Sequence, residues 1–219
     1  MVKRAVDEFH IHYEKSRIWE KTSWLGVPCW KLPFDAFILQ EMIYEVRPEY
    51  IIETGTAYGG SALFFASICE LLGEGKVITC DIQSKVDQKD IGQFHWADRI
   101  EFIHGGSLNQ IVRANIKERC EGKRNLVILD SYHSYDHVKA EIAWYSKLVP
   151  VGSYLIVEDT HVSGHPVPWK HGKGPYEAVE DFLSKDFQES DGSPNWRAEY
   201  WAEKYIMTFN PNGYLKRIK

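Results

Sequence analysis

The stretch YIIETGTAYGGS, residues 50–61, decides the fold that we expect for this chain. It opens with a short apolar run, as a buried parallel strand does, and turns acidic at Glu53. Gly55, Gly59 and Gly60 follow, and then a helical pattern begins. Glycines at a strand-to-helix turn let a ligand approach the backbone, and free N–H groups at a helix start suit an anion or the polar part of a nucleotide-like cofactor. The spacing G-x-x-x-G-G differs from the dinucleotide-binding G-x-G-x-x-G, and a glycine-rich turn without any ligand is the alternative.

Strand and helix patterns alternate along the rest of the chain. We expect strands at Tyr50–Glu53, Lys76–Cys80, Ile100–His104, Asn125–Leu129 and Ser153–Val157, and a closing pair at Trp196–Tyr200 and Tyr205–Asn210. Helices are expected at Ser61–Leu72, Asn109–Arg119, Tyr135–Leu148 and Pro175–Phe187, with an earlier one that opens at Pro33 and ends at Arg47. This alternation predicts an α/β fold with three layers, in which helices cover both faces of a mostly parallel, Rossmann-like sheet of seven strands with an antiparallel last hairpin.

Composition is that of an ordinary soluble protein, and 219 residues predict a single domain. Within it we expect an N-terminal helical cap, residues 1–48, before a Rossmann-like core, residues 49–219. The net charge of −5 argues against a nucleic-acid partner, and no apolar run is long enough to span a membrane. The start of the chain lacks an apolar signal core, and the four cysteines form no C-x-x-C pair. We therefore expect reduced thiols and a cytoplasmic location, with disulfides as the alternative.

Acidic residues stand where the expected parallel strands end. They are Glu53, Asp81, Asp130, Glu158 and Asp159. Because the carboxyl ends of parallel strands meet at one edge of a sheet, these carboxylates would repel one another unless a cation lies among them. Oxygen ligands from Asp130, Glu158 and Asp159 suit Mg²⁺. Asp81, after the second strand, is placed to accept hydrogen bonds from ribose hydroxyls. Taken singly, each acid also fits a helix cap or an ordinary loop.

Several of these segments together carry a family resemblance. ETGTAYGGS, then Asp81-Ile82, LDSYHSYDHV, YLIVEDT and GKGPYEAVEDFL occur in this order. The chain resembles the cephalosporin hydroxylase/rhamnosyl O-methyltransferase family over roughly residues 33–217. That family belongs to the class I S-adenosylmethionine-dependent methyltransferases, so the resemblance implies this cofactor, Mg²⁺ and methyl transfer.

The resemblance also implies roles for single residues. The methionine part of the cofactor would be held by Glu53, Gly55, Thr56, Ala57, Tyr58, Gly59, Gly60 and Ser61. The ribose would be bound by Asp81 beside Ile82, and the adenine would lie by Gly106 and Ser107. The Mg²⁺ positions of the family are matched by Asp130, Glu158 and Asp159, with Asp130 also at the cofactor.

A base must take the proton from the acceptor hydroxyl. The cluster after Asp130 offers His133, Asp136 and His137, and histidine is a reasonable base near neutral pH. In the similar catechol-type O-methyltransferases a lysine stands three residues after the corresponding aspartate, where this chain has His133. A packing or capping role is the alternative for His137.

The expected function is therefore Mg²⁺-dependent O-methylation of a vicinal hydroxyl on a sugar or polyhydroxylated natural product. Specificity is expected in residues 1–31 and in the loop Thr160–Gly174, whose histidines 161, 165 and 171 could cover the acceptor or lie in solvent. One alternative is an NAD-dependent sugar epimerase or dehydrogenase, for which Tyr135 and Lys139 have the Tyr-x-x-x-Lys spacing. Another is a catalytically degenerate partner subunit. Homo-oligomers are a family tendency.

Overall fold

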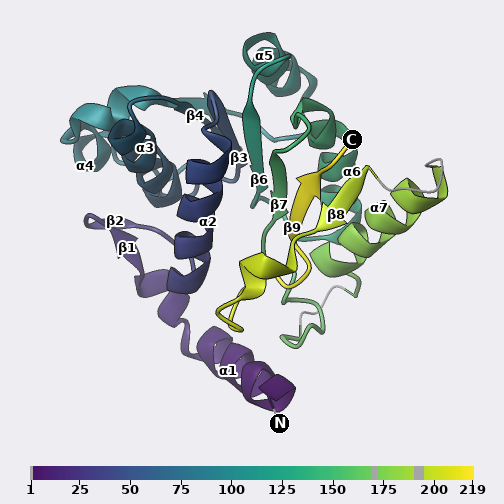
Figure 1. Cartoon of the computed structure of the whole chain (residues 1–219). Helices are drawn as coiled ribbons and strands as arrows, with labels where there is room; N and C mark the ends of the chain where they lie inside the picture. The colour runs from purple at the N-terminus through teal and green to yellow at the C-terminus, as the bar shows by residue number, and fades with distance from the viewer. Residues whose placement is uncertain (1, 169–171, 190–194) are drawn as a thin grey trace.

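A seven-stranded sheet forms the centre of the computed structural model, which describes residues 2–168, 172–189 and 195–219 (Figure 1). Its strands are β3 (Tyr50–Thr54), β4 (Lys76–Asp81), β5 (Ile100–His104), β6 (Asn125–Leu129), β7 (Tyr154–Val157), β8 (Trp196–Ala198) and β9 (Tyr214–Arg217). The spatial order is β5-β4-β3-β6-β7-β9-β8. The first five strands are parallel, and β9 runs antiparallel to both β7 and β8. The expected three-layer α/β fold is confirmed.

Helices cover both faces of this sheet (Figure 1). The longer ones are α1 (Val2–Ser16), α2 (Pro33–Val46), α3 (Gly60–Leu72), α5 (Gln110–Cys120), α6 (Tyr135–Tyr145) and α7 (Pro175–Glu189). The short ones are α4 (Gln88–Gly92) and the 3₁₀ turns η1 (Ile18–Lys21), η2 (His95–Arg99), η3 (Ser146–Leu148) and η4 (Tyr200–Glu203). Adjacent strand residues point to opposite faces, so Ile51 packs with α2 and α3 while Ile52 packs with α5, α6 and α7.

The N-terminal segment continues past α1 and η1 into a two-stranded hairpin, β1 (Ser23–Trp24) and β2 (Val27–Pro28), which lies against α3. Rings of α1 also contact the far end of the chain, because Tyr13 packs edge-on against Phe209 with 5.5 Å between ring centroids. Segments distant in sequence therefore meet at the edge of the sheet where the parallel strands end.

The prediction of a strand at Tyr205–Asn210 is wrong. This segment is irregular, and the closing strand is β9, which starts at Tyr214. Two backbone N–H groups of the segment bond to buried side chains and not to a neighbouring strand. The N–H of Phe209 donates to Asp35 (2.9 Å), and the N–H of Asn210 donates to the Thr208 hydroxyl (3.0 Å). The hydrogen bonds of this stretch are thus satisfied without a neighbouring strand.

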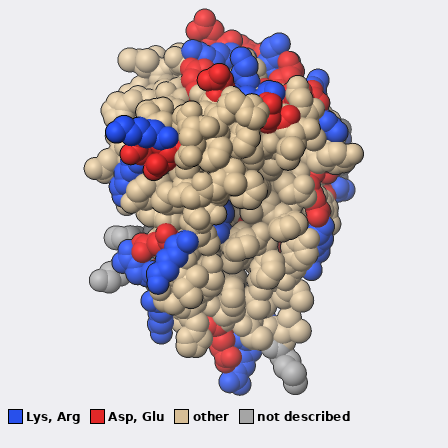
Figure 2. All heavy atoms as spheres, turned by 90° about the vertical axis from the view of Figure 1, so that its left-hand side faces the viewer, with Lys and Arg blue, Asp and Glu red and all other residues tan. Residues whose placement is uncertain are grey.

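On the face seen in Figure 2, lysine and arginine side chains lie beside aspartate and glutamate side chains, not in one continuous basic patch. No helix within the described ranges combines the length and apolar character that crossing a bilayer requires. All four cysteines are free and buried.

Candidate active site

The glycine-rich turn after β3 is fixed by close backbone packing on both sides. Gly55 has φ +91°, and a Cβ there would lie 1.9 Å from the carbonyl oxygen of Asp130. A Cβ on Gly60 would lie 2.1 Å from the carbonyl oxygen of Pro28. Only glycine tolerates these contacts, so the turn is held between the end of β6 and the N-terminal hairpin. This explains why the sequence places glycine at both positions.

A cavity of about 510 Å³ opens over this turn. Most of the residues predicted for the site line it: Gly55, Thr56, Ala57, Tyr58, Gly60, Ser61, Asp81, Ile82, Gly106, Ser107, Asp130, His133, His137 and Asp159. Residues at the end of β4 and in the loops that follow β3, β5 and β6 are thereby gathered around one space, as expected for the carboxyl edge of a parallel sheet. A volume of this size accommodates a cofactor-sized ligand.

Four predicted residues lie outside the lining. Glu53 is fully buried beneath the turn and accepts a hydrogen bond from the Thr79 hydroxyl (2.7 Å). Gly59 faces the side chain of Ile91 in α4. Asp136 is exposed in the first turn of α6, and Glu158 is buried below the cavity floor.

Asp81 connects the glycine turn to the loop after β4. One carboxylate oxygen accepts the backbone N–H of Ala57 (2.9 Å), and the other accepts that of Gln83 (2.8 Å). The carboxylate is therefore held at the cavity wall in a fixed orientation, and its remaining lone pairs are free to accept ligand hydroxyls.

His137 belongs to a hydroxyl network on the same wall. Its Nε2 lies 3.0 Å from Ser131 Oγ and 3.3 Å from Ser107 Oγ, and Ser131 donates to the buried Glu141 (2.8 Å). This network places His137 beside Ser107, the residue predicted to lie by the adenine.

Asp130, His133 and Asp159 form a candidate metal group. One ligand atom from each lies within 4.8 Å of the others. His133 Nε2 is 3.3 Å from Asp159 Oδ2 and 3.8 Å from Asp130 Oδ1. Asp159 has a left-handed backbone (φ 57°), and its N–H donates to the Asn210 side chain (2.9 Å). Two carboxylates and an imidazole, converging at a cavity, are a chemically suitable donor set for a divalent ion.

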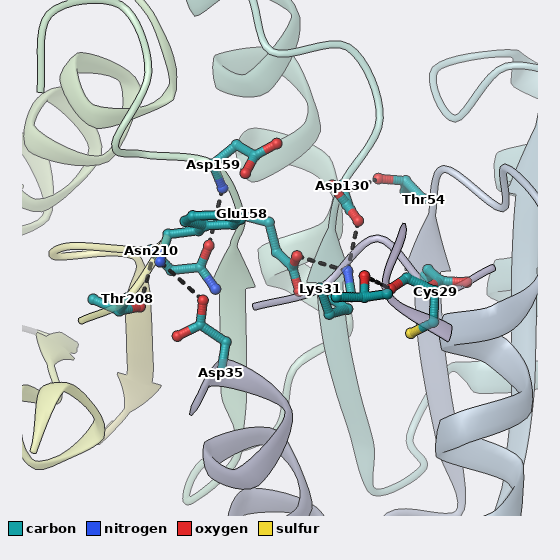
Figure 3. Close-up of polar contacts among 12 residues, drawn as sticks. Cys29, Lys31, Asp35, Thr54, Asp130, Glu158, Asp159, Thr208 and Asn210 are labelled. Carbon is teal, nitrogen blue, oxygen red and sulfur yellow. Dashed lines mark hydrogen bonds and ion pairs between the residues drawn. The ribbon is translucent and has the colours of Figure 1, made fainter. Parts of the chain in front are cut away.

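Lys31 is the site residue that the sequence analysis missed. Its side chain is 4% exposed, and its ammonium donates to Asp130 Oδ2 and Glu158 Oε2, both at 2.6 Å (Figure 3). Glu158 is thereby turned inward, apart from the Asp130–His133–Asp159 group. The one signal in the sequence is a single charged residue between the apolar pairs Cys29-Trp30 and Leu32-Pro33.

The buried charges around Lys31 do not balance. Burial by itself disfavours the ammonium, but Asp130 and Glu158 outweigh it and hold the pKa of Lys31 well above its ordinary value. Burial raises the pKa of Glu53 to about 7 and that of Glu158 well above its usual range. Three carboxyl groups face one ammonium, so protons neutralise the excess charge unless a further cation binds.

Aromatic residues from the N-terminal segment close the other side of the cavity. Trp30 stands edge-on between Trp19 and Tyr58, with ring centroids 5.2 and 5.1 Å apart. Deeper in, His161 stacks on Phe209 at 4.3 Å, and all five rings line the cavity.

The histidines of the loop Thr160–Gly174 divide between two places. His161 lines the cavity, while His165 lies 2.9 Å from Glu177 and stacks on Tyr176, apart from the cavity lining. His171 lies outside the described residues. The loop thus brings His161 to the site, and His165 packs against α7.

The Tyr135–Lys139 pair considered for a dehydrogenase is not at the cavity. Lys139 donates to the Tyr135 hydroxyl (2.8 Å), which donates to Asp181 of α7 (2.7 Å). Neither residue lines the cavity, so the pair joins two helices.

Comparison with known proteins assigns this chain to a family. A family model described as Rhamnosyl O-methyltransferase/CmcI matches residues 16–218. The chain belongs to this family. A rhamnosyl O-methyltransferase of Mycobacterium bovis is 36% identical over 221 residues, covering 97% of this chain and 85% of the relative. One from Mycobacterium leprae is 35% identical over 226 residues, covering 99% and 94%. The match reaches further into the N-terminal segment than the sequence motifs indicated.

Solved structures of this and related families share the fold. An apo structure of CmcI superposes with a TM-score of 0.65 at 19% identity, covering 91% of this chain and 77% of that one. A Bacillus cereus O-methyltransferase in complex with S-adenosylhomocysteine gives 0.60 at 18% identity, covering 91% of both. The expected class I methyltransferase fold is thereby confirmed.

Proposed function

We propose that this protein transfers the methyl group of S-adenosylmethionine to a hydroxyl of a sugar or a similarly polyhydroxylated small molecule, with a divalent ion, Mg²⁺, at the acceptor. The observation that carries the proposal is that one cavity brings together the glycine turn and the Asp130–His133–Asp159 group. Family relatives named rhamnosyl O-methyltransferases support a sugar as acceptor.

The cofactor would lie between the glycine turn and the ends of β4 and β5. Asp81, held by two backbone N–H groups, would accept the ribose hydroxyls. The backbone of the turn Gly55–Ser61 would face the methionine part, and Ser107 with His137 would flank the adenine.

Asp130 and Asp159 would hold the ion, with Glu158 as a third oxygen ligand. When bound, Mg²⁺ would supply Lewis-acid polarisation of the acceptor oxygens and lower the pKa of the attacking hydroxyl. The carboxyl groups of Glu53, Asp130 and Glu158 together can carry more negative charge than the single ammonium of Lys31 neutralises. This excess fits a binding site for a further cation.

Proton transfer falls to the chain's own residues. The acceptor oxygen attacks the methyl carbon, the carbon–sulfur bond breaks with its electron pair going to sulfur, and S-adenosylhomocysteine leaves. His133, oriented by Asp159 at 3.3 Å, is placed to take the hydroxyl proton. Asp136 is exposed and outside the lining, and His137 is in the hydroxyl network, so His133 is the base that the geometry supports best.

The acceptor would enter along the N-terminal wall. Trp19 and Trp30 offer flat apolar faces of the kind that stack on sugar rings, and Glu14 of α1 offers a carboxylate for hydroxyls. A second, more open hollow of about 500 Å³ shares Glu14 and Trp19 with the cavity and adds Ile11, Val167 and Pro168. The part of the acceptor beyond the methylated sugar would lie there.

Calorimetry and a labelled-methyl assay test the proposal together. We expect S-adenosylhomocysteine to bind and NAD⁺ not to bind. Label from S-adenosylmethionine should pass to a rhamnoside acceptor, stop with a chelator and return with Mg²⁺. NAD⁺ binding without S-adenosylhomocysteine binding would refute the proposed methyltransferase activity. Full turnover in the presence of chelator would refute the role of the divalent ion.

A further inference from the structure

Lys31 and the expected metal ion would use the same carboxylates. The ammonium takes one oxygen of Asp130 and one of Glu158 at 2.6 Å (Figure 3). The other oxygen of Asp130 faces His133, and the other oxygen of Glu158 is buried with no hydrogen-bond partner among the described residues. Asp159 follows Glu158 directly and turns its carboxylate to His133 instead. Glu158 therefore has unused acceptor capacity that a bound cation could satisfy.

We propose that Lys31 is a tethered internal cation that a divalent ion displaces from Glu158, so that ion binding is coupled to the position of the N-terminal segment. This inference rests on the proposed function, since it assumes that an ion binds at Asp130 and Asp159. In this proposal Lys31 is a positioning residue. It holds the carboxylates of Asp130 and Glu158 in place until the ion binds them.

Electrostatics gives the physical reason. An ammonium and a divalent ion repel each other strongly at contact distance inside a buried site, so the two cannot share the same carboxylate oxygens. The ion carries twice the charge and binds carboxylates through directional coordination, so it is the stronger competitor. Lys31 must then move, because it is too buried to keep its place beside a second cation.

The backbone link that carries Lys31 determines which residues move when its side chain is displaced. Lys31 lies on the short link between β2 and α2, and its backbone N–H donates to the carbonyl of Cys29 (2.8 Å). Trp30, its neighbour in sequence, is part of the aromatic wall of the cavity. Release of Lys31 would therefore shift the wall against which the acceptor stacks, and by reciprocity a bound acceptor would change the affinity for the ion.

The alternative is that Lys31 is a permanent counter-charge. The ion would then rest on Asp130, His133 and Asp159, and Glu158 would never reach it. The two arrangements predict opposite effects when the Lys31 charge is removed.

Titration calorimetry with Mg²⁺, in saturating S-adenosylhomocysteine, separates them. We expect Lys31→Met to bind Mg²⁺ more tightly by on the order of tenfold, because two carboxylates lose a competing cation. The gain should vanish in the double variant Lys31→Met/Glu158→Gln. Lys85→Met is the matched control, since Lys85 lines the same cavity over the rings of Trp30 and Tyr58 without contacting a carboxylate of the group, and we expect its Mg²⁺ affinity to be that of the unaltered protein. Unchanged or weaker Mg²⁺ binding by folded Lys31→Met would overturn the inference.

Hydrogen exchange on the unaltered protein tests the same point without a variant. Mg²⁺ should raise amide exchange in residues 22–32, whose tether is released, and leave β6 protected. If Mg²⁺ binds and exchange in residues 22–32 is unchanged or slower, the displacement is refuted while the proposed function stands. If neither the unaltered protein nor Lys31→Met binds Mg²⁺, the ion-dependent part of the proposed function fails along with it.

Discussion

Acidification should destabilise the folded protein through one buried histidine of α1. His10 is 3% exposed and packs its ring near those of His161 and Phe209, with centroids 5.3 and 6.1 Å away. Burial, helped by the nearby His161, lowers the pKa of His10 from 6.5 to about 4. The folded state therefore favours the neutral ring, and the unfolded chain binds the proton more readily.

The sign and size of the effect follow from this difference. The stabilisation from neutral His10 is fully present above pH 6.5 and is lost progressively as the pH falls from 6.5 to about 4. The full difference corresponds to about 3 kcal/mol, and about 2 kcal/mol of it is lost by pH 5. For a chain of this length, that loss lowers the melting temperature by about 4–8 °C.

His10→Phe isolates the contribution, because phenylalanine keeps an aromatic ring but cannot be protonated. Urea unfolding at pH 7.5 and pH 5.0 should give a drop in the free energy of unfolding that is about 2 kcal/mol smaller for His10→Phe than for the unaltered protein. His12→Gln, an exposed histidine on the same helix, should show the unaltered drop. Equal drops for the unaltered protein and His10→Phe would refute the reasoning.

Three further predictions concern the turn, the cofactor and the acceptor. Gly55→Ala should lower the free energy of unfolding in urea by more than about 2 kcal/mol, since its Cβ would meet the Asp130 carbonyl, whereas Gly73→Ala, with open space around it, should cost only about 1 kcal/mol. Asp81→Ala should weaken S-adenosylhomocysteine binding by about tenfold or more in calorimetry. An unchanged affinity would contradict the role of Asp81 as the acceptor of the ribose hydroxyls. Trp19→Ala should raise KM for a glycoside acceptor by about tenfold with little change in cofactor affinity, and an unchanged KM would contradict the acceptor wall.

Local patterns were enough to predict the sheet and one half of the site. The segments Ile100–His104 and Asn125–Leu129 became strands with the predicted bounds: the second is an apolar stretch ended by Asp130, and the first has three apolar residues and is ended by Gly105. Asp81, Asp130 and Asp159 reach the cavity because a parallel sheet brings its strand ends to one edge.

Contacts between distant segments could not be predicted in this way. Lys31 is 99 residues from Asp130 in sequence, and nothing in its surroundings names a partner. The segment Tyr205–Asn210 reads as a strand because it is rich in apolar and aromatic residues, but the buried Asp35, far upstream, takes the N–H of Phe209. In both cases the outcome depends on a buried polar group whose partner only the fold supplies.

The backbone of Pro28 rests on Gly60 with no space for a methyl group between them. A chimera that grafts the first 32 residues of a relative onto this core must therefore bring a hairpin of matching shape, or the start of helix α3 will shift. Under the proposed function, a change in the main-chain path of the hairpin would disturb both the acceptor wall and the cofactor turn, so engineering of new substrates should begin with side chains on the hairpin.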